Sequence, residues 1–279
     1  MAEPITKLTT KMTDTNIVFV IIFRNLLDFL FLLSIIILIE NKSRVCKEQF
    51  MIRILFQGDS ITDGNRYKDP STRWDLNHQI GHSYAYLIAA HFGRKYPGKY
   101  YFINRGVSGD CIDKAAKRWE ADTLGEHPDV LSVLLGINEQ ANRDGNYPEG
   151  AEAHLEHFDK TYRELLDSAR EQNPALKLVI LEPFFLPVGK YIEHYHDFMK
   201  VFVRKQAIIK KIAEDYGAIF IPIQKRLEAV VEEYAPILKA NGCDTDPNAY
   251  WLWDGVHPTE AMQGFIAELW IEATKDLMC

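Results

Sequence analysis

Five short apolar runs that alternate with longer amphipathic stretches constrain the fold of this chain more than any other feature. The runs are rich in β-branched, aromatic and leucine residues, as buried strands are, while the longer stretches have the apolar period of helices. Strands that alternate with helices predict right-handed crossovers and a parallel sheet covered on both faces. We therefore predict one three-layer α/β domain with a five-stranded parallel sheet. The expected strands are 52–57, 100–104, 130–135, 176–181 and 218–223, and the expected helices are 83–94, 112–123, 150–172, 197–216 and 259–277.

The first fifty residues differ in composition from the rest, and we place a domain boundary between 1–50 and 51–279. Residues 17–39 are almost continuously apolar and would span roughly 34 Å as a helix, which is enough for the core of a bilayer. Arg24 and Asp28 interrupt this segment, at a cost of about 2.5–3.5 kcal/mol each near the bilayer centre. Two interpretations stay open: a membrane anchor, or an upstream extension of the reading frame with the folded domain starting at Met51.

The charges and cysteines argue against several classes of protein. The formal net charge is -7 and no long run of Lys or Arg occurs, so a nucleic-acid partner is not expected. The 4 cysteines are scattered with no Cys-x-x-Cys pair, and the histidines form no tetrahedral ligand set. We therefore expect no disulfide framework and no bound metal. The flanking charges favour a cytoplasmic domain, with a membrane anchor through residues 17–39 as the alternative.

Three of the predicted strands are followed by polar residues or glycine at their carboxyl ends. Ser60 comes after the first strand, Gly106 after the second and Asn138 after the third. In open α/β sheets, ligand sites gather outside the carboxyl ends of the strands. Each of these residues alone could equally belong to a turn or a helix cap. Together they predict a functional site at one edge of the sheet.

A histidine and an aspartate near the C-terminus complete a set of groups for acyl transfer. A serine hydroxyl is a weak nucleophile until a base within hydrogen-bond reach removes its proton. His257 is the candidate base for Ser60, and Asp254, on the same tight loop, is the candidate group that orients the imidazole ring. The backbone amides of Ser60 and Gly106 and the side-chain amide of Asn138 are the candidate oxyanion donors. The alternative for the histidine loop is an ordinary turn followed by a helix start.

Four segments in this order resemble the four signature blocks of the SGNH, or GDSL-type, hydrolase superfamily. That resemblance implies a flavodoxin-like α/β/α domain, hydrolysis of esters by the groups named above, and no metal or organic cofactor. The third block usually has an aspartate after its asparagine, and Glu139 stands there instead, which could reshape the substrate edge but keeps the donor. The four segments are Gly58-Asp59-Ser60, Asn104-Arg105-Gly106, Gly136-Ile137-Asn138-Glu139 and Asp254-Gly255-Val256-His257-Pro258.

Aromatic residues in the expected strand-end loops suit the stacking of a sugar ring, although such residues more often pack the core. Many similar single-domain members of the superfamily look like carbohydrate deacetylases, so we expect acetyl or other short-chain esters of an oligosaccharide or small molecule. The alternatives are a lysophospholipase or thioesterase-like acyl hydrolase, and a non-catalytic binding module on the same fold. The candidate substrate contacts are Trp74, Glu139, Trp253 and Asp59, the last of which could instead hold its own loop, and further aromatic candidates are Phe184, Phe185, Tyr191, Tyr195 and Trp251.

Overall fold

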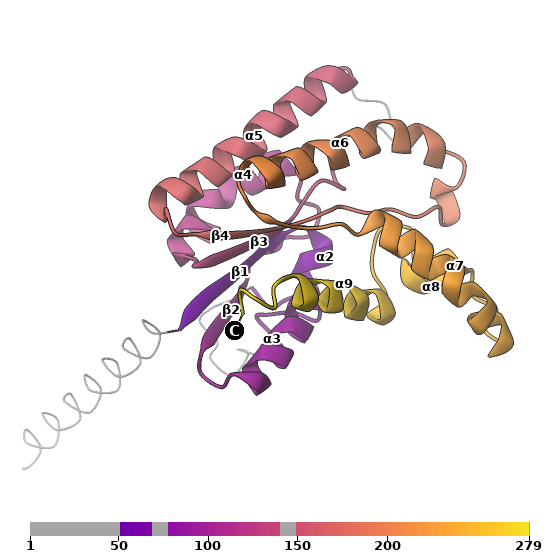
Figure 1. The fold of residues 1–279 in the computed structure, drawn as a ribbon. Helices are drawn as coiled ribbons and strands as arrows, with labels where there is room; N and C mark the ends of the chain where they lie inside the picture. The colour runs from indigo at the N-terminus through magenta and orange to yellow at the C-terminus, as the bar shows by residue number, and fades with distance from the viewer. Residues whose placement is uncertain (1–50, 69–77, 140–148, 279) are drawn as a thin grey trace, which may run out of the picture. The chain divides into compact units, whose positions relative to one another are not determined.

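The computed structural model describes residues 51–68, 78–139 and 149–278 of the chain (Figure 1). The chain divides into two compact units, Met1–Met51 and Ile52–Cys279, and every strand and helix described below belongs to the second. The apolar segment 17–39 and the candidate contact Trp74 lie outside the described residues. Across the three described ranges, no helix combines the length and the apolar character needed to cross a membrane.

The strands form one parallel sheet in the order β2-β1-β3-β4-β5. This is the strand order of flavodoxin-like folds, so the predicted fold class is confirmed. The direction of winding reverses at β1, and ligands bind outside the carboxyl ends of the strands at such a switch point. The bounds are β1 (Ile52–Gly58), β2 (Tyr100–Asn104), β3 (Val130–Leu134), β4 (Lys177–Leu181) and β5 (Ile219–Ile221).

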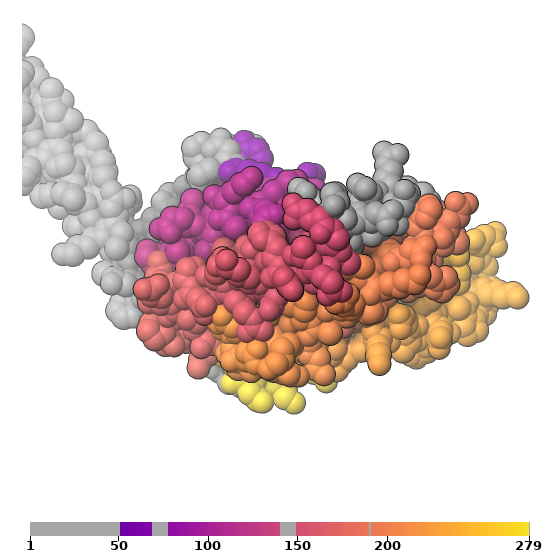
Figure 2. Space-filling view, turned by 90° about the horizontal axis from the view of Figure 1, so that it is seen from above, coloured from indigo at the N-terminus to yellow at the C-terminus, as the bar shows by residue number. Residues whose placement is uncertain are grey.

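Helices cover both faces of the sheet. In Figure 1, α4, α5 and α6 lie on one face, and α3 and α9 lie on the other, with α7 and α8 beside α9. Figure 2 looks onto the layer of α5 and α6, whose side chains cover the sheet from that side. The bounds are α3 (Tyr84–Lys95), α4 (Ile112–Asp122), α5 (Ala151–Gln172), α6 (Tyr195–Asp215), α7 (Gln224–Ala240), α8 (Pro247–Trp251) and α9 (Glu260–Ala273).

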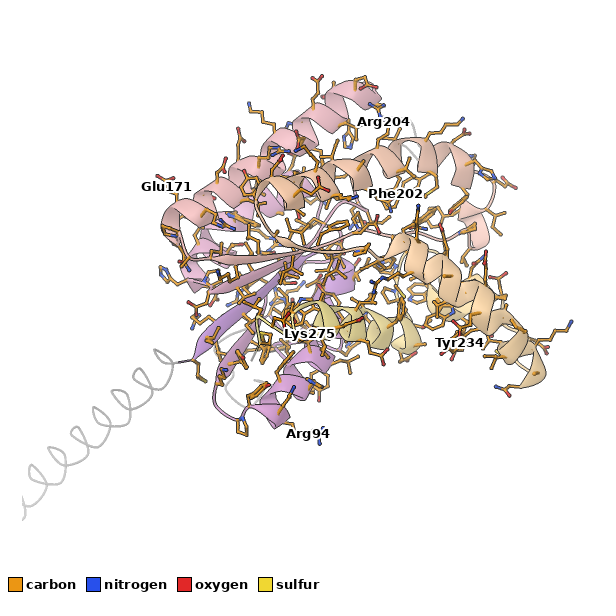
Figure 3. All side chains as sticks on the ribbon, viewed as in Figure 1. Arg94, Glu171, Phe202, Arg204, Tyr234 and Lys275 are labelled. Atoms are coloured by element: carbon orange, nitrogen blue, oxygen red, sulfur yellow. The ribbon has the colours of Figure 1, made fainter. Side chains whose placement is uncertain are left out.

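Two buried clusters, one on each face of the sheet, hold the layers together. Because alternate residues of a strand point to opposite faces, Ile54 and Phe56 of β1 join the cluster under α3 and α9, while Leu55 joins the cluster under α4 and α5. Both faces are covered, which is why the strands are apolar runs rather than alternating patterns. Figure 3 shows the side chains that fill these layers, with the labelled Phe202 of α6 among the fully buried ones.

The predicted strands and long helices are present, with ends displaced by a few residues, but the prediction lacks α7 and the short helices α2 (Ser60–Asp63) and α8. The sequence of α7 is hard to recognise as a helix because Pro236 lies inside it and Ile237 and Tyr234 are exposed. A proline normally ends a helix, and exposed apolar residues blur the single apolar stripe that predicts one. The fully buried Leu227 anchors α7 to the core instead.

Candidate active site

Ser60 is the first residue of a one-turn helix, α2 (Ser60–Asp63), that follows β1 directly. Asp59 caps this helix, because its Oδ1 accepts a hydrogen bond from the Ile61 N–H at 3.0 Å. The turn requires glycine before Asp59, since a Cβ on Gly58 would lie 2.2 Å from Thr62 Oγ1. As the first amide of a helix, the Ser60 N–H has no intrahelical acceptor. It is therefore a candidate donor to a ligand.

Ser60, His257 and Asp254 form a continuous chain of hydrogen bonds. Ser60 Oγ lies 2.9 Å from His257 Nε2, and His257 Nδ1 lies 2.7 Å from Asp254 Oδ2. With Nδ1–H donating to the carboxylate, Nε2 carries the lone pair that can accept the serine proton. The fold therefore brings together the three residues predicted as a triad, although Ser60 and His257 are 197 positions apart.

His257 and Asp254 lie on a tight loop between α8 and α9 whose geometry is set locally. Asp254 Oδ1 accepts hydrogen bonds from the amides of Val256 at 3.0 Å and His257 at 2.8 Å. Gly255 has a φ of +91°, and a Cβ there would lie 2.5 Å from Leu186 O, so the position requires glycine. Partial burial opposes ionisation of Asp254, but the hydrogen bonds from His257 and Val256 outweigh it and lower the pKa of the carboxyl. The imidazole therefore faces an ionised partner.

The structure corrects the prediction that Gly106 is an oxyanion donor. Its N–H donates to Asn104 Oδ1 at 2.9 Å and is thus used inside the loop. The residue is buried, and a Cβ there would lie 2.5 Å from the amide nitrogen of Asp63. Gly106 therefore lets the loop pack closely against α2, and its amide is not available to a reacting oxygen.

Another glycine of the same loop, Gly109, replaces Gly106 as the candidate donor. It is exposed, has a φ of +79°, and its N–H has no acceptor among the described residues. A Ser-Gly pair is a turn signal, and it could have pointed to this position in the sequence. The amides around it are all used: Arg105 N–H donates to Phe56 O, Val107 N–H to Gly58 O, Ser108 N–H to Asp63 Oδ2 and Asp110 N–H to Val107 O.

Asn138 follows β3 and is half-buried beside the loop that carries Gly109. Its side-chain Nδ2 donates to Asp110 O at 3.2 Å. An amide nitrogen carries two hydrogens, so the second can serve a ligand. Ser60, Gly109 and Asn138 are thus three uncharged N–H donors that follow β1, β2 and β3 at their carboxyl ends.

Residues 56–264 match the GDSL-like lipase/acylhydrolase family. The matched stretch includes the serine, the oxyanion candidates, and the aspartate and histidine of the base loop. The chain belongs to this family. The resemblance seen in the four sequence segments is therefore confirmed, and the protein is a carboxylic ester hydrolase.

Relatives of the hydrolase match it over most of their length. An acetylxylan esterase from Geobacillus stearothermophilus is 27% identical over 229 residues, which cover 78% of this chain and 92% of that protein. A solved structure from Parabacteroides merdae, described as a GDSL-like lipase, is 31% identical with a TM-score of 0.61, over 80% of this chain and 95% of that chain. A solved variant of an acetyl xylan esterase from Geobacillus stearothermophilus is 25% identical with a TM-score of 0.58, over 80% of this chain and 94% of that chain.

Two residues predicted as substrate contacts, Asp59 and Glu139, are buried in the hydrolase. Asp59 is 1% exposed and Glu139 is 8% exposed, and Glu139 Oε1 accepts a hydrogen bond from the Ile112 N–H at 3.0 Å. Burial raises the pKa of Asp59 to about 7, and the nearby charges of Asp110 and Glu139 add to the effect. Burial also raises the pKa of Glu139. Both carboxyl groups hold loops together, so the structure corrects the prediction that they contact the substrate.

An open groove of about 640 Å³ leads to Ser60 and His257. Trp253 lines it with 60% of its surface exposed, and its ring stacks on the His257 ring with 5.4 Å between centroids and 19° between planes. Among the predicted substrate contacts that the structure describes, Trp253 thus lies at the site. The other lining residues include polar and charged ones, namely Asn65, Lys68, His82, Ser108, Glu260 and Gln263. The aromatic candidates Phe184, Phe185 and Trp251 belong to the buried core instead, with Tyr191 and Tyr195 packed against it.

Acidic and imidazole side chains do not gather into a metal site in the described ranges. No group of three or more His, Cys, Asp or Glu side chains there could hold an ion. The surface His157, for example, pairs its Nε2 with Asp113 Oδ1 at 2.7 Å.

Proposed function

We propose that this hydrolase is a serine esterase that removes acetyl groups from carbohydrate esters. The observation that carries the proposal is the chain of hydrogen bonds from Ser60 through His257 to Asp254, at 2.9 and 2.7 Å. In this proposal Ser60 is the nucleophile and His257 is the general base and then the general acid. Asp254 orients the imidazole and stabilises its protonated form.

The first half-reaction transfers the acetyl group to the enzyme. Ser60 Oγ attacks the carbonyl carbon while His257 Nε2 takes the hydroxyl proton, and the carbonyl electrons move onto the oxygen. The Ser60 and Gly109 amides and Asn138 Nδ2 donate to that oxyanion, each such donor being worth about 10²–10³ in turnover. The alcohol oxygen of the sugar then leaves with the proton from His257. The acetyl group remains on Ser60 as an ester.

The second half-reaction releases acetate. His257 Nε2 takes a proton from a water molecule as its oxygen attacks the acetyl carbonyl carbon. The same three donors stabilise the second oxyanion, and its collapse returns the proton to Ser60 Oγ. Because hydrogen bonds lower the pKa of Asp254, its carboxylate stays ionised at neutral pH and stabilises the imidazolium in both halves.

The groove supports a carbohydrate as the alcohol part of the substrate. Trp253 offers an exposed aromatic face beside the base, on which a sugar ring can stack. Lys68, His82 and Gln263 supply hydrogen-bonding groups for sugar hydroxyls along the same groove. Similarity to the acetylxylan esterase of Geobacillus stearothermophilus supports acetyl as the acyl part.

A series of aryl esters from acetyl to octanoyl tests this proposal. We expect the acetyl ester to be hydrolysed fastest, with a steep loss beyond propionyl, and we expect Ser60→Ala to abolish turnover of every ester. Ser168→Ala is the matched control, because Ser168 Oγ bonds to Leu165 O within α5, away from the groove. Full activity of Ser60→Ala would remove Ser60 from the mechanism.

The same series separates the alternatives. A preference for octanoyl esters would favour a lysophospholipase or thioesterase-like acyl hydrolase. Failure to hydrolyse any ester would favour a non-catalytic binding module and would overturn the proposal. If acetyl esters are preferred, the release of acetate from acetylated xylo-oligosaccharides tests directly whether a carbohydrate is the alcohol part of the substrate. A rate no higher than for aryl acetates would contradict a carbohydrate substrate.

A further inference from the structure

One arginine of α4 contacts two of the backbone segments that carry the proposed oxyanion donors. Arg118 uses three of its nitrogen atoms to reach outside its own helix. We propose that Arg118 is a positioning residue that fixes the geometry of the oxyanion hole. The inference rests on the proposed function, because it assumes that Ser60, Gly109 and Asn138 stabilise a reacting oxygen.

The guanidinium holds the Gly109 loop at both of its ends. Arg118 Nη1 donates to Arg105 O at 2.6 Å, and Arg118 Nε donates to Asp110 Oδ2 at 2.6 Å. Arg105 and Asp110 bracket the candidate donor Gly109, whose own amide makes no contact among the described residues. Since glycine restrains its backbone least of all residues, the direction of this N–H depends on such contacts to its neighbours.

The same side chain also reaches the end of β1, the strand that precedes the nucleophile. Arg118 Nη2 donates to Gly58 O at 3.3 Å, and Gly58 precedes Ser60 by two residues. Val107 N–H donates to the same carbonyl at 3.0 Å, so the end of β1 and the Gly109 loop are joined at one oxygen. A shift of Arg118 would therefore move the Ser60 amide and the Gly109 amide relative to each other.

The third donor is connected through Asp110. Asn138 Nδ2 donates to Asp110 O at 3.2 Å, while the carboxylate of Asp110 is held by Arg118. The Asp110 side chain is 6% exposed and that of Arg118 is 17% exposed, so this ion pair is largely shielded from water. Removing the guanidinium would leave a buried carboxylate without its partner, which is costly. Asp110 would then move, and Asn138 would lose its fixed acceptor.

An arginine suits this position because one side chain makes all three contacts, to Asp110, Arg105 and Gly58. A guanidinium presents five N–H donors in a rigid fork and stays charged at every working pH, whereas a lysine is a point charge on a flexible stem. The contact that Arg118 makes within α4, to Asp122 Oδ2 at 3.1 Å, is an i,i+4 pair of the kind that contributes little to stability. It also touches none of the donor-bearing segments, and so Asp122 offers a matched control.

Kinetics of the full chain on an aryl acetate test the proposal. Arg118→Met should lower kcat by about 10²-fold with KM changed by less than about threefold, because donors to the transition state are misplaced while substrate binding is kept. Arg118→Lys should recover part of the loss, and Asp122→Asn should stay within about twofold of the parent enzyme. A kcat of Arg118→Met within about twofold of the parent, or an equal loss in Asp122→Asn, would overturn the proposal.

A double-mutant cycle with Asn138→Ala distinguishes positioning from general destabilisation. If Arg118 acts through the oxyanion hole, the loss of kcat caused by Arg118→Met should be smaller in the Asn138→Ala background than in the parent, because one of the three donors that it positions is already gone. Independent effects would multiply. Multiplying effects would overturn the proposal. If Arg118→Met does not fold, Asp110→Asn removes the same ion pair and keeps the Asp110 carbonyl, and it should lower kcat in the same way. An unchanged kcat in folded Asp110→Asn would equally overturn it.

The control arms separate this inference from the proposed function. If the parent enzyme hydrolyses acetyl esters and Ser60→Ala does not, the proposed function stands whatever Arg118→Met does. If the parent enzyme is inactive on every ester, the proposed function fails, and the proposal for Arg118 falls with it.

Discussion

The two sides of the active site are built in different ways. The base loop closes on itself, because Asp254 Oδ1 binds the amides two and three residues later and Oδ2 binds the His257 ring. The nucleophile side is assembled from distant segments: Asn104 Nδ2 donates to Thr62 O and Ser108 N–H donates to Asp63 Oδ2, across 42 and 45 positions. The base loop can be recognised in the sequence as a short motif. The nucleophile side takes its geometry only once the sheet has formed and has brought its segments together.

Replacement of the reacting groups tests whether the two sides work as one unit. Ser60→Ala and His257→Ala should each lower kcat by about 10⁴-fold or more, and the double variant should lose little beyond that. Asp254→Asn should cost less than His257→Ala, because the aspartate orients the base and transfers no proton. Steady-state hydrolysis of an aryl acetate measures all four variants. If the loss of kcat in the double variant equals the product of the two single losses, Ser60 and His257 do not act as one unit.

Two asparagines sharpen the comparison within the nucleophile side. Asn138→Ala should lower kcat by about 10²–10³-fold with only a small change in Tm, because a donor to the reacting oxygen is lost. Asn104→Ala should instead lower the free energy of unfolding by about 2–3 kcal/mol, since Asn104 Nδ2 donates to the carbonyls of Thr62 at 2.6 Å and Ile80 at 2.8 Å. Measuring kcat and thermal unfolding of both variants checks these expectations. A large loss of stability in Asn138→Ala, or a large loss of kcat in a stable Asn104→Ala, would contradict the division between a catalytic and a structural asparagine.

The buried carboxyl of Asp59 makes the nucleophile side sensitive to pH. Its pKa rises from 3.8 to about 7 on folding, so its contribution to stability is complete below pH 3.8 and is lost as the pH rises through about 7. The parent should therefore lose free energy of unfolding as the pH rises from 5 to 8, and Asp59→Asn should not. The difference between the two proteins should shift in favour of Asp59→Asn by on the order of 2 kcal/mol over this range. Urea unfolding of both proteins at the two pH values measures this gain. A difference that is the same at pH 5 and pH 8 would show that Asp59 ionises normally.

The smallest effect is expected on the base-loop side, from the exposed Trp253. Trp253→Ala should raise KM for an acetylated xylo-oligosaccharide by up to about tenfold while leaving aryl acetate hydrolysis nearly unchanged, because only ring stacking is lost. Tyr86→Ala is the control, since Tyr86 is an exposed aromatic of α3 that does not line the groove. Equal losses on both substrates would mean that Trp253 supports His257 rather than the sugar.

The same division explains what the sequence could predict. The strands are predictable because each is a buried apolar run, and the Asp254–His257 pair is predictable because both residues share one short loop. The Ser108-Gly109 pair signals a turn in the sequence, but the choice of Gly109 over Gly106 as the donor depends on which amides Asn104 and Asp63 bind after folding. The burial of Asp59 and Glu139 cannot be predicted for a related reason: a polar residue after a strand can face the substrate or the interior, and only tertiary packing decides.

The most direct test is a crystal structure of the enzyme after reaction with a methyl phosphonate ester, which leaves a tetrahedral adduct resembling the acyl-transfer transition state. The account predicts phosphorus bonded to Ser60 Oγ, with one phosphonyl oxygen about 2.7–3.1 Å from the Ser60 amide, the Gly109 amide and Asn138 Nδ2. The Gly106 amide should remain bonded to Asn104. An adduct on another residue, or an oxygen bound by the Gly106 amide instead of Gly109, would contradict it.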